Sequence, residues 1–244
     1  MKPLIWDYRP DGLRAPALAC AFRGWNDAGD ASTTALKVIG RSLDSRRFAR
    51  IDAEEFFDFQ THRPIVELSD GVTREIRWPR NDFREAHVPE ASRDLVLLTA
   101  NEPSMKWRTY CQTVLDLGDA LGAQLVVTLG SLLAEVPHSR PTPLTGLASD
   151  PALLSSMEIE PPNYEGPTGI AGVFQDACVA AGIPAVTFWA AVPHYVSQPP
   201  NPKATVALLR RVVGVPVRTF TIGSTWLGNA SSFRVCRRVS AGLV

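Results

Sequence analysis

The polar turn that spans residues 23–30 has a spacing that could bind a phosphate group. It reads Arg-Gly-Trp-Asn-Asp-Ala-Gly-Asp, and its two glycines, Gly24 and Gly29, are separated by the four residues of a P-loop. Asp30-Ala31 stands, however, where that loop needs Lys followed by Ser or Thr, and two carboxylates would repel a triphosphate. The three-glycine pattern of dinucleotide-binding loops is absent as well. We therefore expect tight backbone geometry at the glycines and a capped helix, with Asp27 or Asp30 as the cap.

The aromatic side chain inside this turn favours a binding surface. Trp25 stands next to Asn26 and Asp27, and Arg23 lies two positions before it. A large aromatic ring beside amide, carboxylate and guanidinium groups is typical of a pocket rim or a subunit interface. The turn therefore predicts one of these two surfaces and leaves the choice between them open.

A second polar group follows residue 130. Glu135, His138 and Arg140 could bind an anion or act in acid–base chemistry, although a salt-linked loop on the domain rim is the simpler alternative. His138 and His194 could ligate a metal together with a carboxylate, but their spacing matches no zinc helix motif, so no metal is predicted. Ser131 follows a glycine without completing a Gly-x-Ser-x-Gly elbow. No catalytic residue and no cofactor can be named from these patterns.

A later turn resembles the first one. Residues 163–169 read Asn-Tyr-Glu-Gly-Pro-Thr-Gly and precede a helical pattern. Thr168 is expected to cap that helix, while Tyr164 and Glu165 could face the same rim as the turn at residues 23–30. A capped loop with a glycine–proline bend is the alternative.

Alternating strand-like and helix-like patterns would position these groups. Short apolar runs predict buried strands at residues 17–22, 94–100, 124–129 and 185–191. Apolar residues at helical spacing predict helices over residues 31–39, 104–121, 170–181 and 202–213, the second capped by Ser104 and the last by Asn201. This alternation predicts an α/β fold, a three-layer α/β/α sandwich with a largely parallel sheet.

The remaining segments are predicted to lie at the margins of that sheet. Residues 53–59 and 72–78 have strand character and are joined through the turn Ser69-Asp70-Gly71, which predicts a hairpin at one sheet edge. Residues 130–150 and 193–201 are predicted to be long irregular loops.

In such a fold the polar residues would gather at the carboxyl ends of the strands, where ligands of α/β sheets bind. We expect a candidate pocket or interface to form from the following residues: Arg23, Trp25, Asn26, Asp27, Asp30, Glu102, Trp107, Glu135, His138, Arg140, Tyr164, Glu165, His194 and Tyr195.

Composition narrows the classes of protein. The chain has 244 residues, of which 45% are hydrophobic and 20% charged, as in a globular protein with a sizeable core. No apolar run reaches membrane-spanning length, and the N-terminus lacks the apolar core of a signal peptide. The four cysteines are far apart and form neither a metal knuckle nor a redox pair. We expect a cytoplasmic protein with no membrane partner.

The net charge of zero conceals an asymmetry along the chain. Residues 1–176 contain all 25 acidic residues, whereas residues 177–244 contain none and carry seven Lys or Arg. The basic residues are sparse and lack regular aromatic neighbours, so nucleic-acid binding is not predicted.

Five segments together resemble actinobacterial members of the proteasome assembly chaperone 2 family. They are the segments at residues 22–32, 101–107, 130–141, 162–170 and 192–202. The resemblance covers residues 1 to 217, which we therefore expect to form a single domain. It implies an α/β/α sandwich similar to the nucleoside phosphorylase fold, self-association into a homo-oligomer, and proteasome subunits as partners.

The chain departs from that family at its C-terminal end. The eukaryotic and archaeal chaperones are associated with a hydrophobic-Tyr-any tail, whereas this chain ends Ala-Gly-Leu-Val, so that binding mode is not carried over. Residues 218–244 are acid-free and lack a clear helical stripe. We expect this segment to be a shifted reading frame or a divergent end, and to be poorly ordered.

The residues and the resemblance together favour a protein-interaction or assembly factor. The alternative is a small-molecule enzyme or binder, nucleoside-like or hydrolase-like in substrate, that uses the rim at the strand ends. A deep pocket with shifted titratable groups would favour the enzyme, whereas a flat apolar face around Trp25 would favour assembly.

Overall fold

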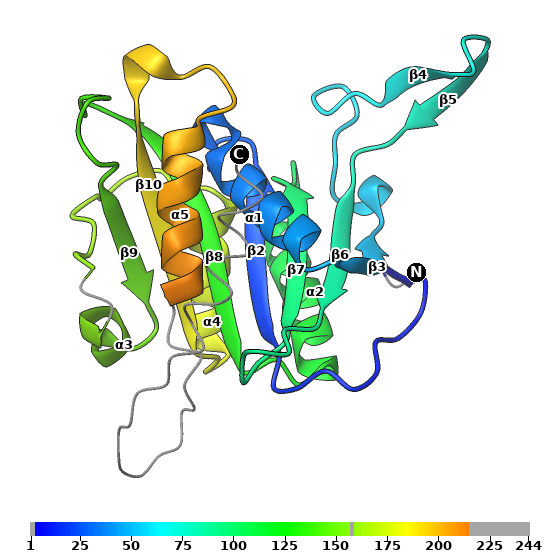
Figure 1. The fold of residues 1–244 in the computed structure, drawn as a ribbon. Helices are drawn as coiled ribbons and strands as arrows, with labels where there is room; N and C mark the ends of the chain where they lie inside the picture. Colours follow the sequence, from blue (N-terminus) through cyan, green and yellow to red (C-terminus); the bar gives the residue numbers. More distant parts are fainter. Residues whose placement is uncertain (1–2, 157–158, 215–244) are drawn as a thin grey trace.

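A computed structural model describes residues 3–156 and 159–214, in which helices cover both faces of a central sheet (Figure 1). The sheet has eight strands in the order β1-β3-β6-β7-β2-β8-β10-β9. Its strands are β1 (Leu4–Trp6), β2 (Ala17–Arg23), β3 (Arg46–Ile51), β6 (Asn81–Ala86), β7 (Leu95–Asn101), β8 (Leu125–Ala134), β9 (Leu144–Ala148) and β10 (Ala185–Pro193). The helices are α1 (Ala31–Ser42), α2 (Trp107–Ala120), α3 (Pro151–Ser156), α4 (Ile170–Ala180) and α5 (Pro202–Gly214).

The predicted α/β/α sandwich is confirmed, with one refinement of strand direction. Strands β7, β2, β8 and β10 run parallel and form the centre of the sheet. The marginal strands β1, β3, β6 and β9 all pair antiparallel to their neighbours. The sheet is therefore mixed, and its parallel part is the part that sequence periodicity identified.

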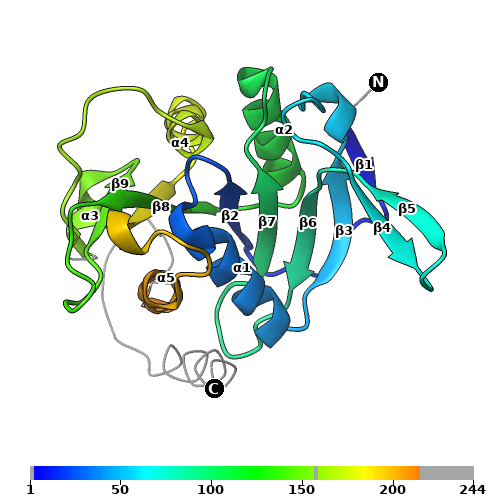
Figure 2. The ribbon, with the colours of Figure 1, turned by 90° about the horizontal axis from the view of Figure 1, so that it is seen from above.

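Two layers of helices bury the alternating side chains of the central strands. Ala17, Ala19 and Ala21 of β2 face a core formed with α1 and α5, whereas Leu18, Cys20 and Phe22 face a core formed with α2 and α4. Seen from above, these helix pairs lie on opposite sides of the sheet (Figure 2). Small alanines on one face let α1 pack closely, and large side chains fill the other face.

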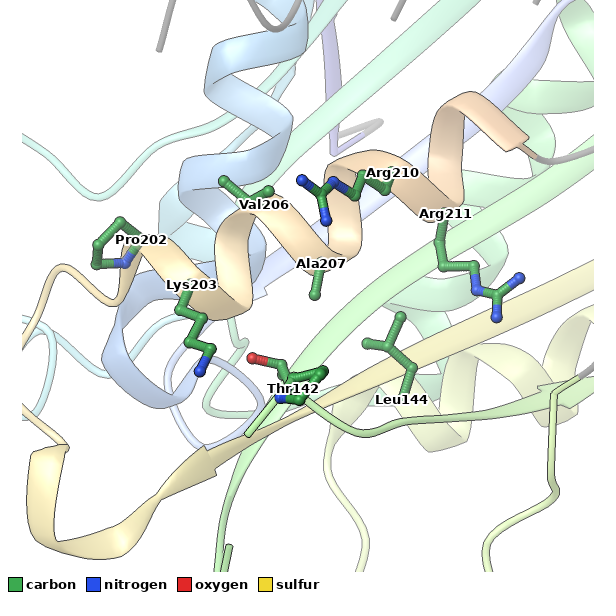
Figure 3. A pocket seen from close by; sticks show the side chains of 9 residues that line it. Thr142, Leu144, Pro202, Lys203, Val206, Ala207, Arg210 and Arg211 are labelled. Atoms are coloured by element: carbon green, nitrogen blue, oxygen red, sulfur yellow. The ribbon is translucent and has the colours of Figure 1, made fainter. Parts of the chain in front are cut away.

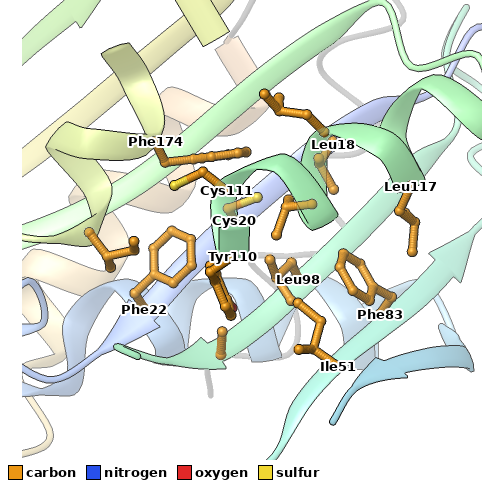
Figure 4. Close-up of a cluster of buried hydrophobic side chains, with 14 of the residues drawn as sticks. Leu18, Cys20, Phe22, Ile51, Phe83, Leu98, Tyr110, Cys111, Leu117 and Phe174 are labelled. Carbon is orange, nitrogen blue, oxygen red and sulfur yellow. The ribbon is translucent and has the colours of Figure 1, made fainter. Parts of the chain in front are cut away.

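The second core holds three free thiols. Cys20, Cys111 and Cys178 are buried in a core of aromatic and aliphatic side chains. Figure 4 shows Cys20 and Cys111 among these side chains, with Phe22 and Tyr110. Burial raises the pKa of the Cys111 and Cys178 thiols to about 12 and raises that of Cys20 well above its ordinary value. These cysteines therefore act as small apolar residues and not as nucleophiles.

The middle of the chain differs from the prediction. Residues 53–59 form no strand; Asp52 accepts a hydrogen bond from the Glu54 N–H and caps a 3-10 helix at Ala53–Glu55. Phe56 and Phe57 are both buried there, which a turn allows and an alternating strand does not.

The predicted hairpin forms instead from β4 (Ile65–Ser69) and β5 (Thr73–Arg77). These two strands make a separate sheet that projects beyond the body, so the hairpin is not an edge of the main sheet (Figures 1 and 2). The predicted turn at residues 69–71 is confirmed, since Asp70 and Gly71 have φ of 57° and 74°. Strands β3 and β6 were not predicted, because charged residues make up half of each strand and obscure its apolar pattern.

The predicted loop at residues 130–150 is largely regular structure. Strand β8 continues to Ala134 because it pairs with β10 up to Pro193. Strand β9 then adds to the outer edge of β10, with Gly146 opposite Phe188. The end of β8 therefore extends, together with β10, past the end of its other neighbour, β2.

The predicted helix caps are partly confirmed. The Asn201 Oδ1 accepts a hydrogen bond from the Ala204 N–H at 3.0 Å, as expected for α5. Ser104 does not cap α2, since the residue at the N-cap is Lys106 with φ of 55°. Thr168 does not cap α4 either, since Gly169 is the N-cap and no side chain of its own turn bonds there.

The prediction for residues 218–244 lies outside the described residues, and the extent of a single domain over residues 1–217 stays a prediction. Among the helices within the described ranges, none is long and apolar enough to span a membrane.

Candidate functional site

The candidate site is built where the ends of β2, β7 and β8 meet the N-terminal end of α4. After β2, the chain turns at Gly24 and crosses over the end of β8. The Ser131 N–H donates to the Asn26 carbonyl and the Ser131 hydroxyl donates to the Ala28 carbonyl, both at 2.9 Å. Ser131 is fully buried, so it anchors the loop and is not available as a nucleophile.

Asp27 caps helix α1, as one of the two predicted alternatives. Its Oδ1 accepts hydrogen bonds from the N–H groups of Ser32 and Thr33, at 2.8 and 3.2 Å, and its carboxylate also accepts from both hydroxyls. Asp27 is 5% exposed, and its carboxylate is held by four donors at the start of α1. Asp30, at the N-cap itself, makes no capping bond and instead forms an exposed ion pair with Arg23 at 2.9 Å.

Glu102 joins three segments at the centre of the site. One carboxylate oxygen accepts from the Asn26 Nδ2 at 2.8 Å and from the Ile170 N–H at 2.9 Å. The other oxygen accepts from the Trp25 N–H at 3.2 Å. The carboxylate thus caps α4 from a distant part of the chain, where negative charge is favoured by the helix dipole. We call Asn26, Glu102, Gly169 and Ile170 the polar node.

Close packing in the polar node explains Gly169. A Cβ atom added at Gly169 would lie 2.4 Å from the Asn26 Oδ1 and 2.5 Å from its Nδ2. The φ of Gly169 is −98°, an ordinary extended backbone, so the glycine is needed for space and not for conformation. Asn26 is fully buried, and its Oδ1 has no hydrogen-bond partner among the described residues. Its orientation is fixed by the Nδ2, because a flipped amide would turn an oxygen toward the Glu102 carboxylate.

The predicted group at residues 135–140 does not assemble as an acid–base set. The Tyr195 hydroxyl accepts from the His138 N–H at 2.9 Å and lies 3.1 Å from the His138 Nδ1. The Lys203 Nζ donates to the carbonyls of His138 and Arg140. In the described part of the chain, neither hydrogen bonds nor ion pairs connect Glu135 with His138 or Arg140. The loop is held by Tyr195 and Lys203 and not by the predicted salt links.

Of the remaining predicted residues, Trp107 is half-buried and the others are exposed. Trp107 is half-buried in α2, and its Nε1 donates to the Pro103 carbonyl at 2.6 Å, so it supports the helix start. Trp25 is 63%, Tyr164 64% and Tyr195 55% exposed. His194 and Glu165 are exposed as well.

Aliphatic residues that the sequence did not single out accompany these aromatic residues. Leu132 and Leu133 lie at the overhanging end of β8 and are 41% and 53% exposed, and Val196 is 45% exposed. The sequence signal for these two leucines is the run Gly-Ser-Leu-Leu-Ala, which follows the predicted end of the strand. In the structure this run is still strand, because the pairing with β10 continues through it. We call Trp25, Leu132, Leu133, Tyr164, Tyr195 and Val196 the apolar rim.

Two grooves of the described chain are lined by none of the residues of the apolar rim. One, of about 670 Å³, runs between α5 and the segment after residue 140, and Lys203, Arg210 and Arg211 give it a basic lining (Figure 3). The other, of about 550 Å³, lies between α1 and β7 and includes Arg41 and Arg84. Neither groove is lined by any residue predicted for the site. Across residues 3–156 and 159–214, His, Cys, Asp and Glu form no group of three that could hold a metal ion.

Comparison with known proteins gives the chain a family. The model of the PAC2 family matches residues 21–220. A search among curated proteins finds no match.

Solved structures agree with the family match. A PAC2 family protein from Streptomyces avermitilis is 46% identical, with a TM-score of 0.78 over 93% of this chain and 94% of that one. A proteasome-assembly chaperone homologue from Mycobacterium tuberculosis is also 46% identical, with a TM-score of 0.77 over 92% of this chain and 91% of that one. An archaeal proteasome activator from Pyrococcus furiosus, 15% identical, shares the fold with a TM-score of 0.69 over 99% of this chain and 96% of that one. The chain therefore belongs to the PAC2 family.

Proposed function

We propose that this chain is a protein-interaction or assembly factor that binds proteasome subunits and associates with copies of itself. The family match and the 46% identity to a chaperone homologue of proteasome assembly support a role of this class. The observation that carries the proposal is the exposure of large apolar side chains at the strand ends. Trp25, Leu133, Tyr164 and Tyr195 are each more than half exposed there, among exposed charged residues.

Two carboxylates at the strand ends accept several hydrogen bonds from within the chain. Asp27 accepts four hydrogen bonds within the α1 start, and Glu102 accepts three from the segments around it. These hydrogen bonds hold both carboxylates against the backbone of the chain and support a structural role for them. Their role is to position the turn.

The apolar rim suits a protein partner. Tryptophan, tyrosine and leucine at 41% to 64% exposure offer large contact area. Aromatic side chains in such positions dominate binding at protein interfaces. The polar node fixes the turn that carries Trp25, because the Trp25 N–H donates to Glu102 and Gly24 lies against the same side chain. A preorganised anchor loses little conformational entropy on binding, which favours affinity.

Affinity capture with matched variants tests the proposal. The bait is the full chain in native lysate of the source organism, and proteasome subunits are identified by mass spectrometry. Trp25→Ala and Tyr164→Ala are expected to lose these subunits, whereas Val179→Ser, which removes a 50% exposed apolar residue on α4, is expected to retain them. A metabolite screen by thermal shift runs on the same bait. Capture without proteasome subunits, together with a clear shift by a nucleoside, would overturn the proposal in favour of a small-molecule binder.

We also expect the chain to act in the cytoplasm. Its three described cysteines are unpaired thiols, which fits a reducing compartment. Fractionation with an antibody to the chain checks this expectation, and recovery outside the cytoplasmic fraction would contradict it.

A further inference from the structure

The basic groove beside α5, which we call the α5 groove, is separate from the surface used in the proposed function. None of its lining residues belongs to the apolar rim or to the polar node. Its volume of about 670 Å³ lies within the range of roughly 300–1,000 Å³ that is typical of ligand sites. One wall is α5, and the other is formed by the start of β9 and the residues before it (Figure 3).

Helix α5 places its cations at the two ends of this groove. Lys203 and Arg210 are seven residues apart, which is about two helical turns and about 10 Å along the helix axis. Between them, Val206 and Ala207 line the groove from α5, and Leu144 lines it from β9. The α5 groove therefore has positive charge at both ends and an apolar middle.

Contacts within the chain fix the end of the groove at Lys203. The Lys203 Nζ donates to the carbonyls of His138 and Arg140, which ties the facing wall to α5. These two carbonyls use two of the three N–H donors of the ammonium group. Thr142 follows in the same wall, and its hydroxyl has no hydrogen-bond partner among residues 3–156 and 159–214. This end can therefore donate from the third N–H and from the hydroxyl to an acceptor in the groove.

The segments around the groove supply no negative charge to balance these cations. Helix α1 packs against α5, and its residues 31–42 contain no Asp or Glu. Residues 136–149 and 177–214, which include the two walls, contain none either. Within the described ranges, neither Lys203 nor Arg210 forms an ion pair. A groove lined by one sign of charge concentrates ligands of the opposite sign.

We infer that the α5 groove binds an acidic segment of another protein, in which two carboxylates flank an apolar residue. A compact anion such as phosphate would reach only one of the two cationic ends. A segment in the extended polyproline II conformation rises about 3.1 Å per residue and has three residues per turn. Acidic side chains three positions apart would then lie on the same side, about 9 Å from each other, which matches the spacing of Lys203 and Arg210.

The contacts in such a complex follow from the chemistry of the groove. One carboxylate accepts from the Lys203 ammonium group and the other from the Arg210 guanidinium, and bonds of this charge-assisted kind are short and strong. The apolar residue between them covers Val206 and Leu144. The C-terminal part of this chain cannot provide the segment, because residues 177–244 contain no acidic residue.

Calorimetric titration of the full chain with three blocked peptides tests the inference. The first peptide is Gly-Gly-Glu-Leu-Pro-Glu-Gly-Gly, the second has Gln in place of both Glu, and the third has the two Glu side by side. The first is expected to bind at least about tenfold more tightly than the second, and more tightly than the third. Equal affinities for the first two peptides, or no binding of the first, would overturn the inference.

Charge variants show whether the peptide occupies the α5 groove. Arg210→Glu is expected to weaken binding of the first peptide by about tenfold or more, and to bind a Glu-Leu-Pro-Lys peptide more tightly than the wild type does. Arg108→Glu is the matched control, because it changes an exposed arginine of α2 on the opposite face of the sheet (Figure 2). It is expected to bind the first peptide like the wild type. Equal losses in both variants would show charge attraction without a site and would overturn the groove.

Two further measurements separate the remaining outcomes. Thermal unfolding followed by circular dichroism checks that Arg210→Glu is folded. A wild-type chain that binds AMP or inorganic phosphate but not the first peptide would overturn the acidic segment as occupant. Trp25→Ala, which tests the apolar rim, is expected to bind the first peptide like the wild type. Failure of the groove and failure of the proposed proteasome role are thus distinguishable.

Discussion

Gly169→Ala is the substitution that most directly probes the polar node. The new methyl group would lie 2.4 Å from the Asn26 Oδ1, so the amide must move away from Glu102. That movement breaks the 2.8 Å bond from the Asn26 Nδ2 to the carboxylate, a charge-assisted bond whose loss costs about 1.5–3 kcal/mol. Alanine at an N-cap costs about a further 0.5–1 kcal/mol. The expected loss of unfolding free energy is therefore about 2–4 kcal/mol.

Urea unfolding followed by circular dichroism measures this loss, and two further variants make the result specific. Gly118→Ala in α2 is the matched control, because a Cβ there meets its nearest neighbours at 3.6 Å. It is expected to be neutral or to stabilise by about 0.5–1 kcal/mol. In an Asn26→Ala background the collision disappears, so Gly169→Ala should then cost at least about 1.5 kcal/mol less than in the wild type. Equal costs in both backgrounds would refute the contact between Gly169 and Asn26 as the reason for the glycine.

Three further predictions concern the cap, the buried carboxylate and the thiols. Asp27→Ala removes the acceptor of two N–H groups and two hydroxyls at α1, and should lower the unfolding free energy by about 2–3 kcal/mol in urea, whereas an unchanged value would contradict the capping role. The buried Asp94 accepts hydrogen bonds from Arg14 and the Val88 N–H, which hold its pKa below the ordinary value despite burial. Its stabilising contribution is thus complete above the unfolded pKa of about 3.9 and is lost as the pH falls further, so Asp94→Asn should flatten the acid limb of a stability–pH curve. In a Cys236→Ser variant, the thiols of Cys20, Cys111 and Cys178 should react with a disulfide reagent only at the rate of unfolding, and rapid labelling of the native chain would contradict their burial.

The central strands could be predicted from the sequence, because the residues that form apolar runs there are the residues that the fold buries. Residues 17–22 and 185–191 are continuous apolar runs, as expected for strands covered on both faces. The marginal strands were missed because their pattern is mixed with charge. Strand β3, Arg-Arg-Phe-Ala-Arg-Ile, has a register shift between Arg47 and Ala49 that destroys a simple alternation. Tertiary pairing, and not local propensity, makes it a strand.

The location of the candidate site could be predicted from the sequence, but the roles of its residues could not. The turn at residues 23–30 does lie at the strand ends, beside Glu102 and Ser131. The bond from the Ile170 N–H to Glu102 joins positions 68 residues apart, and no local motif encodes it. Thr168 was the local candidate for that cap, yet the distant carboxylate holds the helix start. A long-range partner can replace a local cap whenever the fold brings a charge to a helix end.

Direct binding of the purified chain to purified proteasome subunits of the same organism tests the central claim most directly. Trp25 is proposed as an anchor of the apolar rim, and truncating a tryptophan at the centre of an interface typically costs about 2 kcal/mol or more, which is about 30-fold in Kd. Interferometry is expected to show a saturable complex for the wild type, a loss of about 30-fold or more for Trp25→Ala, and no change for Val179→Ser. A wild-type chain that shows no complex, or a Trp25→Ala variant that binds as tightly as the wild type, would contradict the account.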